Sequence, residues 1–186
     1  MKQNPISMYY RGRVQRSWED RGFKIQYYDA ITPDKLKDCS GLTFGTKLTG
    51  RGAPREFTET EKSVWYSHYY LWMHAANKDR PIIVIEHDAF LAIPIPQKHL
   101  TLKNQDYNIV TYCHNKKGGE ISDTPCGAYL INNKIAEKMI KDLSDTVINC
   151  NCDGFLMEYI KKFGESYPLY CRQIQENNVG TTIDHG

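Results

Sequence analysis

Three ionisable side chains stand together directly after a short apolar run in this sequence. Residues 81–85 read Pro-Ile-Ile-Val-Ile, which predicts a strand covered on both faces, and Glu86, His87 and Asp88 follow. Burying a carboxylate is costly unless a cation or hydrogen-bond donors compensate. Carboxylates suit Mg²⁺ or Mn²⁺ holding a diphosphate, and the neighbouring imidazole favours Mn²⁺. The alternative is a solvated turn in which these carboxylates are merely exposed.

An amphipathic helix is predicted before this strand. Thr58 and Glu61 have the spacing of a capping box, in which each side chain binds the other residue's backbone amide, so the helix should begin there. Its apolar face has the spacing of a helix that lies against a core: Val64, Trp65, His68, Leu71, Trp72 and Ala75. Ser67 and His68 precede Trp72 by one turn. On this face His68 is either a core histidine beside a small neighbour or a functional group.

The rest of the chain alternates between strand-like and helix-like patterns. We expect strands at 6–10, 23–28, 107–112, 128–131 and 167–171, helices around Trp18, after Asn132 or Asn133 and from Asp153, and a long loop at 32–55. This alternation predicts an α/β sandwich with a largely parallel central sheet in one domain, residues 1–186. Ligands of such sheets bind beyond the carboxyl ends of the strands, where residues 86–88 fall.

The candidate residues follow a distinctive order along the chain. Glu61 is followed by Ser67-His68, by Trp72 four residues later, and by the apolar run that ends in Glu86-His87-Asp88. This order resembles the pattern of glycosyltransferase family 25, the lipopolysaccharide and collagen galactosyltransferase-like group of GT-A fold, in which the strand ends in Glu-Asp-Asp. A later family signature resembles residues 127–132 followed by Ala136 and Asp153, and the N-terminal part matches around Arg13, Arg16 and Asp29-Ala30.

The resemblance implies a GT-A-type (Rossmann-like) three-layer sandwich with a donor site at the end of the 82–85 strand. Asp88 would bind Mn²⁺ or Mg²⁺, Glu86 would face the ribose or the metal's water, and His87, which replaces the family's middle Asp, would contact metal or sugar or only pack. Ser67 and His68 would shape the donor site from beneath Asp88. Further candidates are Arg13 and Arg16 for the diphosphate, Asp29 in the donor site, Asp153 as general base or helix N-cap, and His185 as a late metal ligand.

The implied activity is an inverting, metal-dependent transfer of a hexose or pentose. The donor would be a nucleotide sugar such as a UDP-sugar, and the acceptor hydroxyl would belong to a glycan or to a hydroxymethylated DNA base, as some bacteriophage enzymes modify. Two other classes stay open. One is a catalytically inactive nucleotide-sugar or partner-binding module in which His87 marks a lost metal site, and the other is a nucleotidyltransferase with an Asp pair on a triphosphate.

Composition narrows the class of protein. The chain has 186 residues, 40% hydrophobic and 25% charged, and its net charge of +2 provides no global field for nucleic acid or an anionic membrane. The longest apolar run is far shorter than the roughly 20 residues of a bilayer span. The polar start, residues 1–5, is unlike a signal peptide. We therefore expect a cytoplasmic protein, in the host cytoplasm if a phage encodes it, and the patterns define no oligomeric state.

The cysteines are expected to be reduced thiols in that compartment. They are Cys39, Cys113, Cys126, Cys150, Cys152 and Cys171. A zinc site formed by Cys150 and Cys152 with Cys113 and His114 is not expected, because the two-residue spacer of a zinc knuckle is absent.

Overall fold

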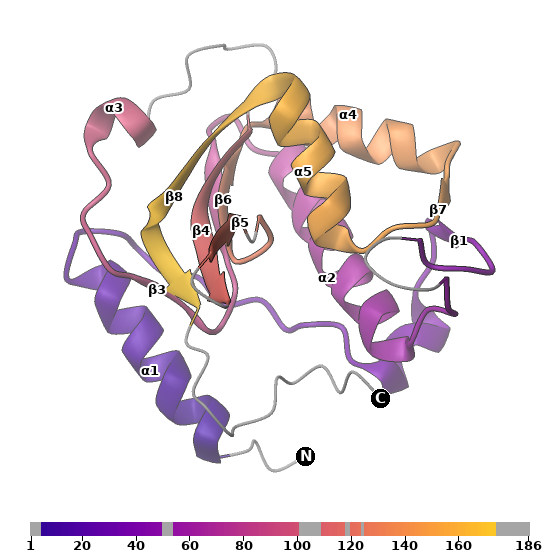
Figure 1. Ribbon diagram of the computed structural model, residues 1–186, viewed down its shortest axis with the longest axis horizontal. Coiled ribbons are helices and arrows are strands. Elements are labelled where there is room, and N and C mark those ends of the chain that lie inside the picture. The colour runs from indigo at the N-terminus through magenta and orange to yellow at the C-terminus, as the bar shows by residue number, and fades with distance from the viewer. Residues whose placement is uncertain (1–4, 50–53, 101–108, 118–119, 124, 174–186) are drawn as a thin grey trace.

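The computed structural model describes residues 5–49, 54–100, 109–117, 120–123 and 125–173 (Figure 1). The helices are α1 (Pro5–Glu19), α2 (Glu59–Ala76), α3 (Gln97–Leu100), α4 (Asn133–Ser144) and α5 (Cys152–Phe163), with a 3₁₀ turn η1 (Pro33–Asp38). The strands are β1 (Thr43–Phe44), β2 (Ile82–Ile85), β3 (Ala89–Leu91), β4 (Ile109–Lys117), β5 (Glu120–Asp123), β6 (Ala128–Ile131), β7 (Val147–Ile148) and β8 (Gly164–Gln173).

The central sheet is mixed, so the prediction of a largely parallel sheet is wrong. Its strand order is β2-β6-β4-β8-β3, with β5 paired to β4, and only β4 and β8 run parallel. The antiparallel β4-β5 pair leads directly into β6, which also runs against β4, whereas β8 returns parallel to β4 after the helical segments α4 and α5. Alternating sequence patterns reveal strands but not their direction, which depends on how the connections are built. A separate pair, β1 and β7, is parallel.

The sheet curls so that its two edge strands meet at one turn. β2 and β3 lie at opposite ends of the strand order, yet only residues 86–88 separate them along the chain. A flat five-strand sheet would hold its edge strands about 19 Å apart, given about 4.8 Å between neighbours. The four Cα–Cα steps from Ile85 to Ala89 reach at most about 15 Å. The 86–88 turn therefore closes the gap between the two edges.

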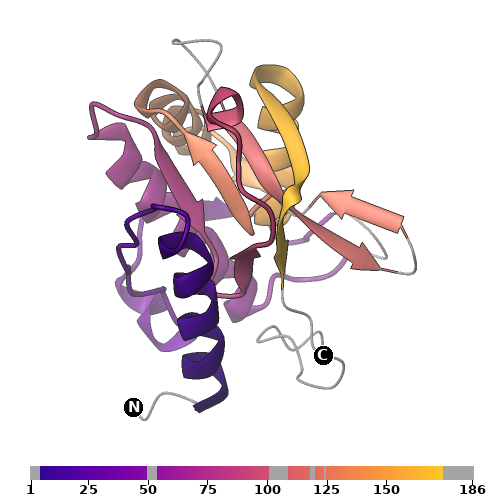
Figure 2. The same cartoon turned by 90° about the vertical axis from the view of Figure 1, so that its left-hand side faces the viewer.

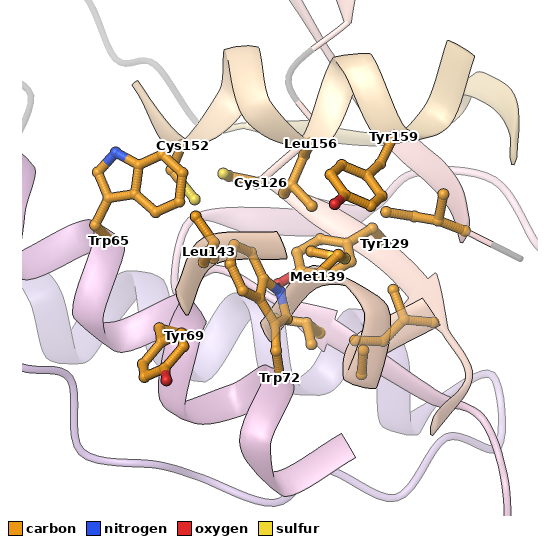
Figure 3. Close-up of a cluster of buried hydrophobic side chains, with 14 of the residues drawn as sticks. Trp65, Tyr69, Trp72, Cys126, Tyr129, Met139, Leu143, Cys152, Leu156 and Tyr159 are labelled. Atoms are coloured by element: carbon orange, nitrogen blue, oxygen red, sulfur yellow. The ribbon is translucent and has the colours of Figure 1, made fainter. Parts of the chain in front are cut away.

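Helices cover both faces of this sheet, which confirms the predicted α/β class. On one face α2, α4 and α5 bury an aromatic-rich core that includes Trp65, Trp72, Tyr129 and Leu156 (Figure 3). On the other face lies α1 (Figure 2). Its Trp18 is buried in a smaller core. Residues of β2 pack into both cores, so the prediction of a strand covered on both faces is confirmed.

The start and the buried face of α2 are as predicted. The Thr58 hydroxyl accepts from the Glu61 amide at 3.2 Å, and the Glu61 carboxylate accepts from the Thr58 amide at 3.0 Å. Arg55 also donates to both Glu61 oxygens, at 2.6 and 2.8 Å. Trp65, His68, Trp72 and Ala75 of the predicted face are buried, whereas Val64 and Leu71 are only half-buried, and the buried face also includes Tyr66 and Tyr69. The capping box therefore sets the register that brings His68 to the sheet.

The helix predicted around Trp18 is confirmed as α1, but the two strands predicted beside it are wrong. Residues 6–10 belong to helix α1 rather than to a strand, and residues 23–28 form no strand. Periodicity cannot distinguish a strand from a helix in so short an apolar run. The helix is anchored by its other end, where the Trp18 indole donates to the carbonyl of Ala89 at 3.1 Å.

The remaining predicted elements are present; the strand at 128–131 has the predicted bounds as β6, and the others have shifted bounds. The predicted loop at 32–55 contains η1 and the short strand β1, and the last predicted strand, 167–171, is longer as β8. Asn132 is the N-cap of α4, as one of the two predicted alternatives had it, and Ile135, Met139 and Leu143 of this helix are buried. Asn151, rather than Asp153, is the N-cap of α5. In the described part of the chain, no helix has both the length and the apolar character that a bilayer crossing needs.

Candidate functional site

The 86–88 turn places two carboxyl groups where the sheet edges converge. The Glu86 amide donates to the carbonyl of Gly127 at 2.9 Å, which extends the β2-β6 ladder by one residue. The Ala89 amide then donates to the Glu86 carbonyl at 3.1 Å and closes the turn. Glu86 and Asp88 are half-buried, whereas His87 between them is exposed to solvent. The predicted position at a strand's carboxyl end is confirmed, although β2 is an edge strand.

The Glu86 carboxylate is held by polar groups from two other elements. Gln173, at the end of β8, donates to Oε2 at 2.8 Å. His68 Nε2, on α2, lies 3.6 Å from Oε1. Burial works to raise the pKa of Glu86, but the interaction with the His68 imidazole holds it below its ordinary value. Glu86 is therefore an anion, with 27% of its side chain open to solvent.

Asp88 carries an oxygen that nothing in the described part of the chain satisfies. Its Oδ1 atom is buried and has no hydrogen-bond partner among those residues. Burial, together with the charge of Glu86, raises the pKa of Asp88 to about 6. A buried carboxylate oxygen without a partner is costly unless a cation or a ligand's donor reaches it. The donor set of Glu86 and Asp88, hard oxygens only, fits Mn²⁺ or Mg²⁺.

His68 is a core residue that also reaches the carboxylates. Its Nδ1 atom lies 2.8 Å from the hydroxyl of Tyr129, which also accepts a hydrogen bond from the Trp72 indole at 2.9 Å. Burial disfavours the imidazolium, but Cys126 and Glu86 raise the pKa of His68 above its ordinary value. Burial keeps Cys126 a neutral thiol by raising its pKa, so Glu86 supplies the negative charge. His68 is therefore a buried core histidine whose ring also faces the Glu86 carboxylate, and its functional role stays a prediction.

Ser67 attaches an N-terminal segment to α2. Its hydroxyl donates to the Ser63 carbonyl at 2.8 Å and accepts from the Ile31 amide at 2.9 Å. This hydrogen bond brings the exposed Asp29, two residues before Ile31, to the side of α2 that carries Ser67. Two segments that the sequence placed in the donor site are thus neighbours.

Asp153 lies in the first turn of α5 without capping it. Asn151 caps the helix by accepting from the Gly154 amide at 2.8 Å. Asp153 Oδ1 instead accepts from the backbone amide of Cys126 at 3.0 Å, and burial raises the pKa of its carboxyl. The N-cap alternative for Asp153 is therefore wrong, and the carboxylate fixes the segment that enters β6.

Of the three remaining candidates, Arg13 and Arg16 lie in the part of the chain that the structure describes. Arg13 and Arg16 are exposed on α1, the helix whose Trp18 binds the Ala89 carbonyl directly after the carboxylate turn. The Arg16 Nε donates to the Gly12 carbonyl of the same helix at 3.2 Å. His185 lies outside the residues that the structure describes.

The comparison with known families covers this site. The model of glycosyltransferase family 25 (LPS biosynthesis protein) matches residues 10–118, more than half of the chain. The chain belongs to glycosyltransferase family 25. Membership supports glycosyltransferase activity in general and implies a nucleotide-sugar donor and an acceptor. The search of curated proteins finds no match. Within the family match lie Arg13, Asp29, His68 and the carboxylate turn, whereas Tyr129 and Asp153 lie beyond it.

Sequence reasoning missed two residues that orient the site of this family 25 chain. Gln173 follows the last predicted strand and has no pattern that distinguishes it from a surface glutamine. Tyr129 stands in a buried apolar strand, where the signal available was its hydroxyl, since a buried tyrosine hydroxyl usually finds a hydrogen-bond partner. That signal does not identify His68 and Trp72 as the partners of the Tyr129 hydroxyl.

Proposed function

We propose that this chain is a metal-dependent, inverting glycosyltransferase that moves a sugar from a nucleotide-sugar donor to an acceptor hydroxyl. The observation that carries the proposal is the buried, unpartnered Oδ1 atom of Asp88 beside the Glu86 carboxylate, inside the segment that matches family 25. Asp88 and Glu86 would hold Mn²⁺ or Mg²⁺. When bound, this cation would neutralise charge on the departing nucleoside diphosphate.

The chain's own residues then have distinct tasks in this proposal. His68 and Gln173 orient Glu86 from two sides, so its carboxylate is in place before the donor binds. Ser67 binds the amide of Ile31, two residues after the donor-site candidate Asp29, and Arg13 and Arg16 offer guanidinium groups to the diphosphate. His87 is exposed and so is accessible to metal or sugar. His185 is a further candidate ligand.

The transfer step needs a base for the acceptor hydroxyl. The acceptor oxygen forms a bond to the anomeric carbon while the bond from that carbon to the diphosphate oxygen breaks on the opposite face, which inverts the configuration. The hydroxyl proton passes to a carboxylate, for which we propose Asp153. Burial raises the pKa of Asp153, which makes its ionised form a better proton acceptor.

We favour a glycan over a hydroxymethylated DNA base as acceptor. The family description names lipopolysaccharide biosynthesis, and the net charge of +2 provides no strong field for DNA. We also propose that residues 1–186 form one catalytic domain. Transfer from a UDP-sugar to oligosaccharide acceptors, compared with transfer to hydroxymethylcytosine-containing DNA, distinguishes the two acceptor classes.

Calorimetry with a panel of UDP-hexoses, with and without Mn²⁺, tests the proposal. Asp88→Asn should abolish Mn²⁺-dependent donor binding and UDP release without a loss of melting temperature, because the change opens no cavity. Asp79→Asn is the matched control, since Asp79 is exposed in the turn before β2. Equal Mn²⁺-dependent binding in Asp88→Asn and wild type would contradict the metal site. Tight donor binding without any release of UDP would favour the inactive binding module instead.

A further inference from the structure

A cluster of two thiols and one imidazole lies behind the carboxylate turn. His68, Cys126 and Cys152 are all buried, and one potential ligand atom of each lies within 4.8 Å of the other two. In Figure 3 the sulfur atoms of Cys126 and Cys152 point toward one another beneath α5. The three residues come from α2, from the segment before β6 and from the first turn of α5. We propose that His68, Cys126 and Cys152 form a second metal site, which binds Zn²⁺ and is distinct from the site at Glu86 and Asp88.

The dimensions of the cluster suit zinc. Bonds of about 2.3 Å to sulfur and about 2.0 Å to nitrogen in a tetrahedron place neighbouring ligand atoms roughly 3.5 to 3.8 Å apart. The observed upper limit of 4.8 Å therefore requires each ligand to move inward by at most about 1 Å. Three protein ligands suffice for such a site, because a water or a neighbouring carboxylate can occupy the fourth position.

The chemistry of the donor set selects the metal. Thiolate sulfur and imidazole nitrogen prefer Zn²⁺, whereas Mg²⁺ and Mn²⁺ prefer oxygen. Burial raises the pKa of both thiols, so in the absence of metal they are neutral, and a bound cation compensates for the two thiolate charges. Cys152 also stands at the N-terminus of the 12-residue helix α5, whose dipole favours a thiolate.

Surrounding hydrogen bonds hold all three ligands in place. The Tyr129 hydroxyl binds His68 Nδ1, so a metal would bind Nε2, the ring nitrogen that also lies 3.6 Å from Glu86 Oε1. The Asp153 carboxylate binds the amide of Cys126 at 3.0 Å. The Trp65 indole donates to the Cys150 carbonyl at 3.0 Å and fixes the chain two residues before Cys152. Such outer contacts are typical of residues that ligate metals.

A zinc ion at this place would join three segments that are distant in sequence. His68 Nε2 is also the atom that faces Glu86, so a zinc ion bound to it would take the place of the His68–Glu86 contact and would lie beside the Glu86 carboxylate. The proposal does not depend on sugar transfer, because zinc would bind whether or not the chain is catalytically active.

The test uses the complete, reduced protein. After dialysis against metal-free buffer we expect one zinc per chain by elemental analysis. Replacement of zinc by Co²⁺ should produce thiolate-to-cobalt charge-transfer bands in the near ultraviolet and the visible bands of a tetrahedral ion. Removal of the metal by a chelator should lower the melting temperature. Substoichiometric zinc together with a cobalt spectrum that lacks charge transfer would overturn the proposal, and neither measurement needs a variant.

Variants then locate the site. Cys126→Ser and Cys152→Ser should each weaken zinc binding by more than the roughly 10- to 100-fold that loss of an outer contact costs. Cys150→Ser is the matched control, since Cys150 is half-buried beside the same helix start, and it should retain the zinc and the cobalt bands. Asp88→Asn should retain zinc while losing Mn²⁺-dependent donor binding, which separates the two sites. Retention of zinc by both Cys126→Ser and Cys152→Ser would overturn the assignment.

Discussion

The hydroxyl of Tyr129 binds His68 from within the core, and its removal should damage both stability and donor binding. In Tyr129→Phe the ring and its packing remain, but two groups lose their partner. They are His68 Nδ1, at 2.8 Å, and the Trp72 indole N–H, at 2.9 Å. Both residues are buried, so water cannot replace the hydroxyl without opening the core.

The magnitude follows from leaving these groups unsatisfied. A buried polar group without its hydrogen bond costs about 1–3 kcal/mol, and two such groups that share one partner should cost about 2–4 kcal/mol in total. For a chain of this size each kcal/mol corresponds to roughly 2–4 °C in melting temperature. Thermal unfolding of Tyr129→Phe should therefore occur about 4–16 °C below wild type.

Tyr112→Phe is the matched control, because Tyr112 is equally buried but belongs to the core beneath α1. Its hydroxyl donates to a single acceptor, the His99 carbonyl, at 2.7 Å. We expect a smaller loss of stability and unchanged affinity for a UDP-hexose, whereas Tyr129→Phe should weaken donor affinity as His68 loses its orientation toward Glu86. A melting temperature of Tyr129→Phe equal to wild type, or equal effects of the two variants on donor affinity, would refute the reasoning.

Three further predictions concern the core, the start of α2 and the carboxylate turn. Trp72→Ala should cost about 3–5 kcal/mol of unfolding free energy in urea titrations, since the ring is fully buried, and an unchanged midpoint would contradict its place in the core. The hydrogen bonds from Arg55 lower the pKa of Glu61 from 4.5 to about 2. The ionised Glu61 therefore stabilises the fold at neutral pH, and this contribution should disappear as the pH falls from about 4.5 towards about 2. Arg55→Ala should make this loss of stability smaller. The prediction is wrong if the urea midpoints of both proteins have the same pH profile. His87→Asp restores the acidic triplet and should shift the metal preference of donor binding from Mn²⁺ toward Mg²⁺. The melting temperature should not change, because His87 is exposed. Equal metal preference in the two proteins would show that His87 does not contact the metal.

Local patterns in the sequence determined the starts of α2 and α4 and the position of the carboxylate turn. Thr58 and Glu61 define the start of α2, and Asn132 defines the start of α4, because a cap depends only on side chains within three residues of the amides that it binds. Glu86 and Asp88 follow β2 as expected, since an abrupt change from β-branched to ionisable residues is visible in one short stretch. The motif order that shows the family is likewise a property of the chain alone.

Only the tertiary structure decided which groups meet. Glu86 is bound by Gln173, 87 residues later, and His68 by Tyr129, 61 residues later, and neither pair has a sequence signal because each depends on the curl of the mixed sheet. The thiols of Cys126 and Cys152 also meet His68 without a sequence signal, because the three residues come from segments with no shared spacing motif. Strand direction could not be predicted, because hydrophobic periodicity is the same in parallel and antiparallel strands of a covered sheet. The convergence of the two sheet edges on residues 86–88 depends on that direction.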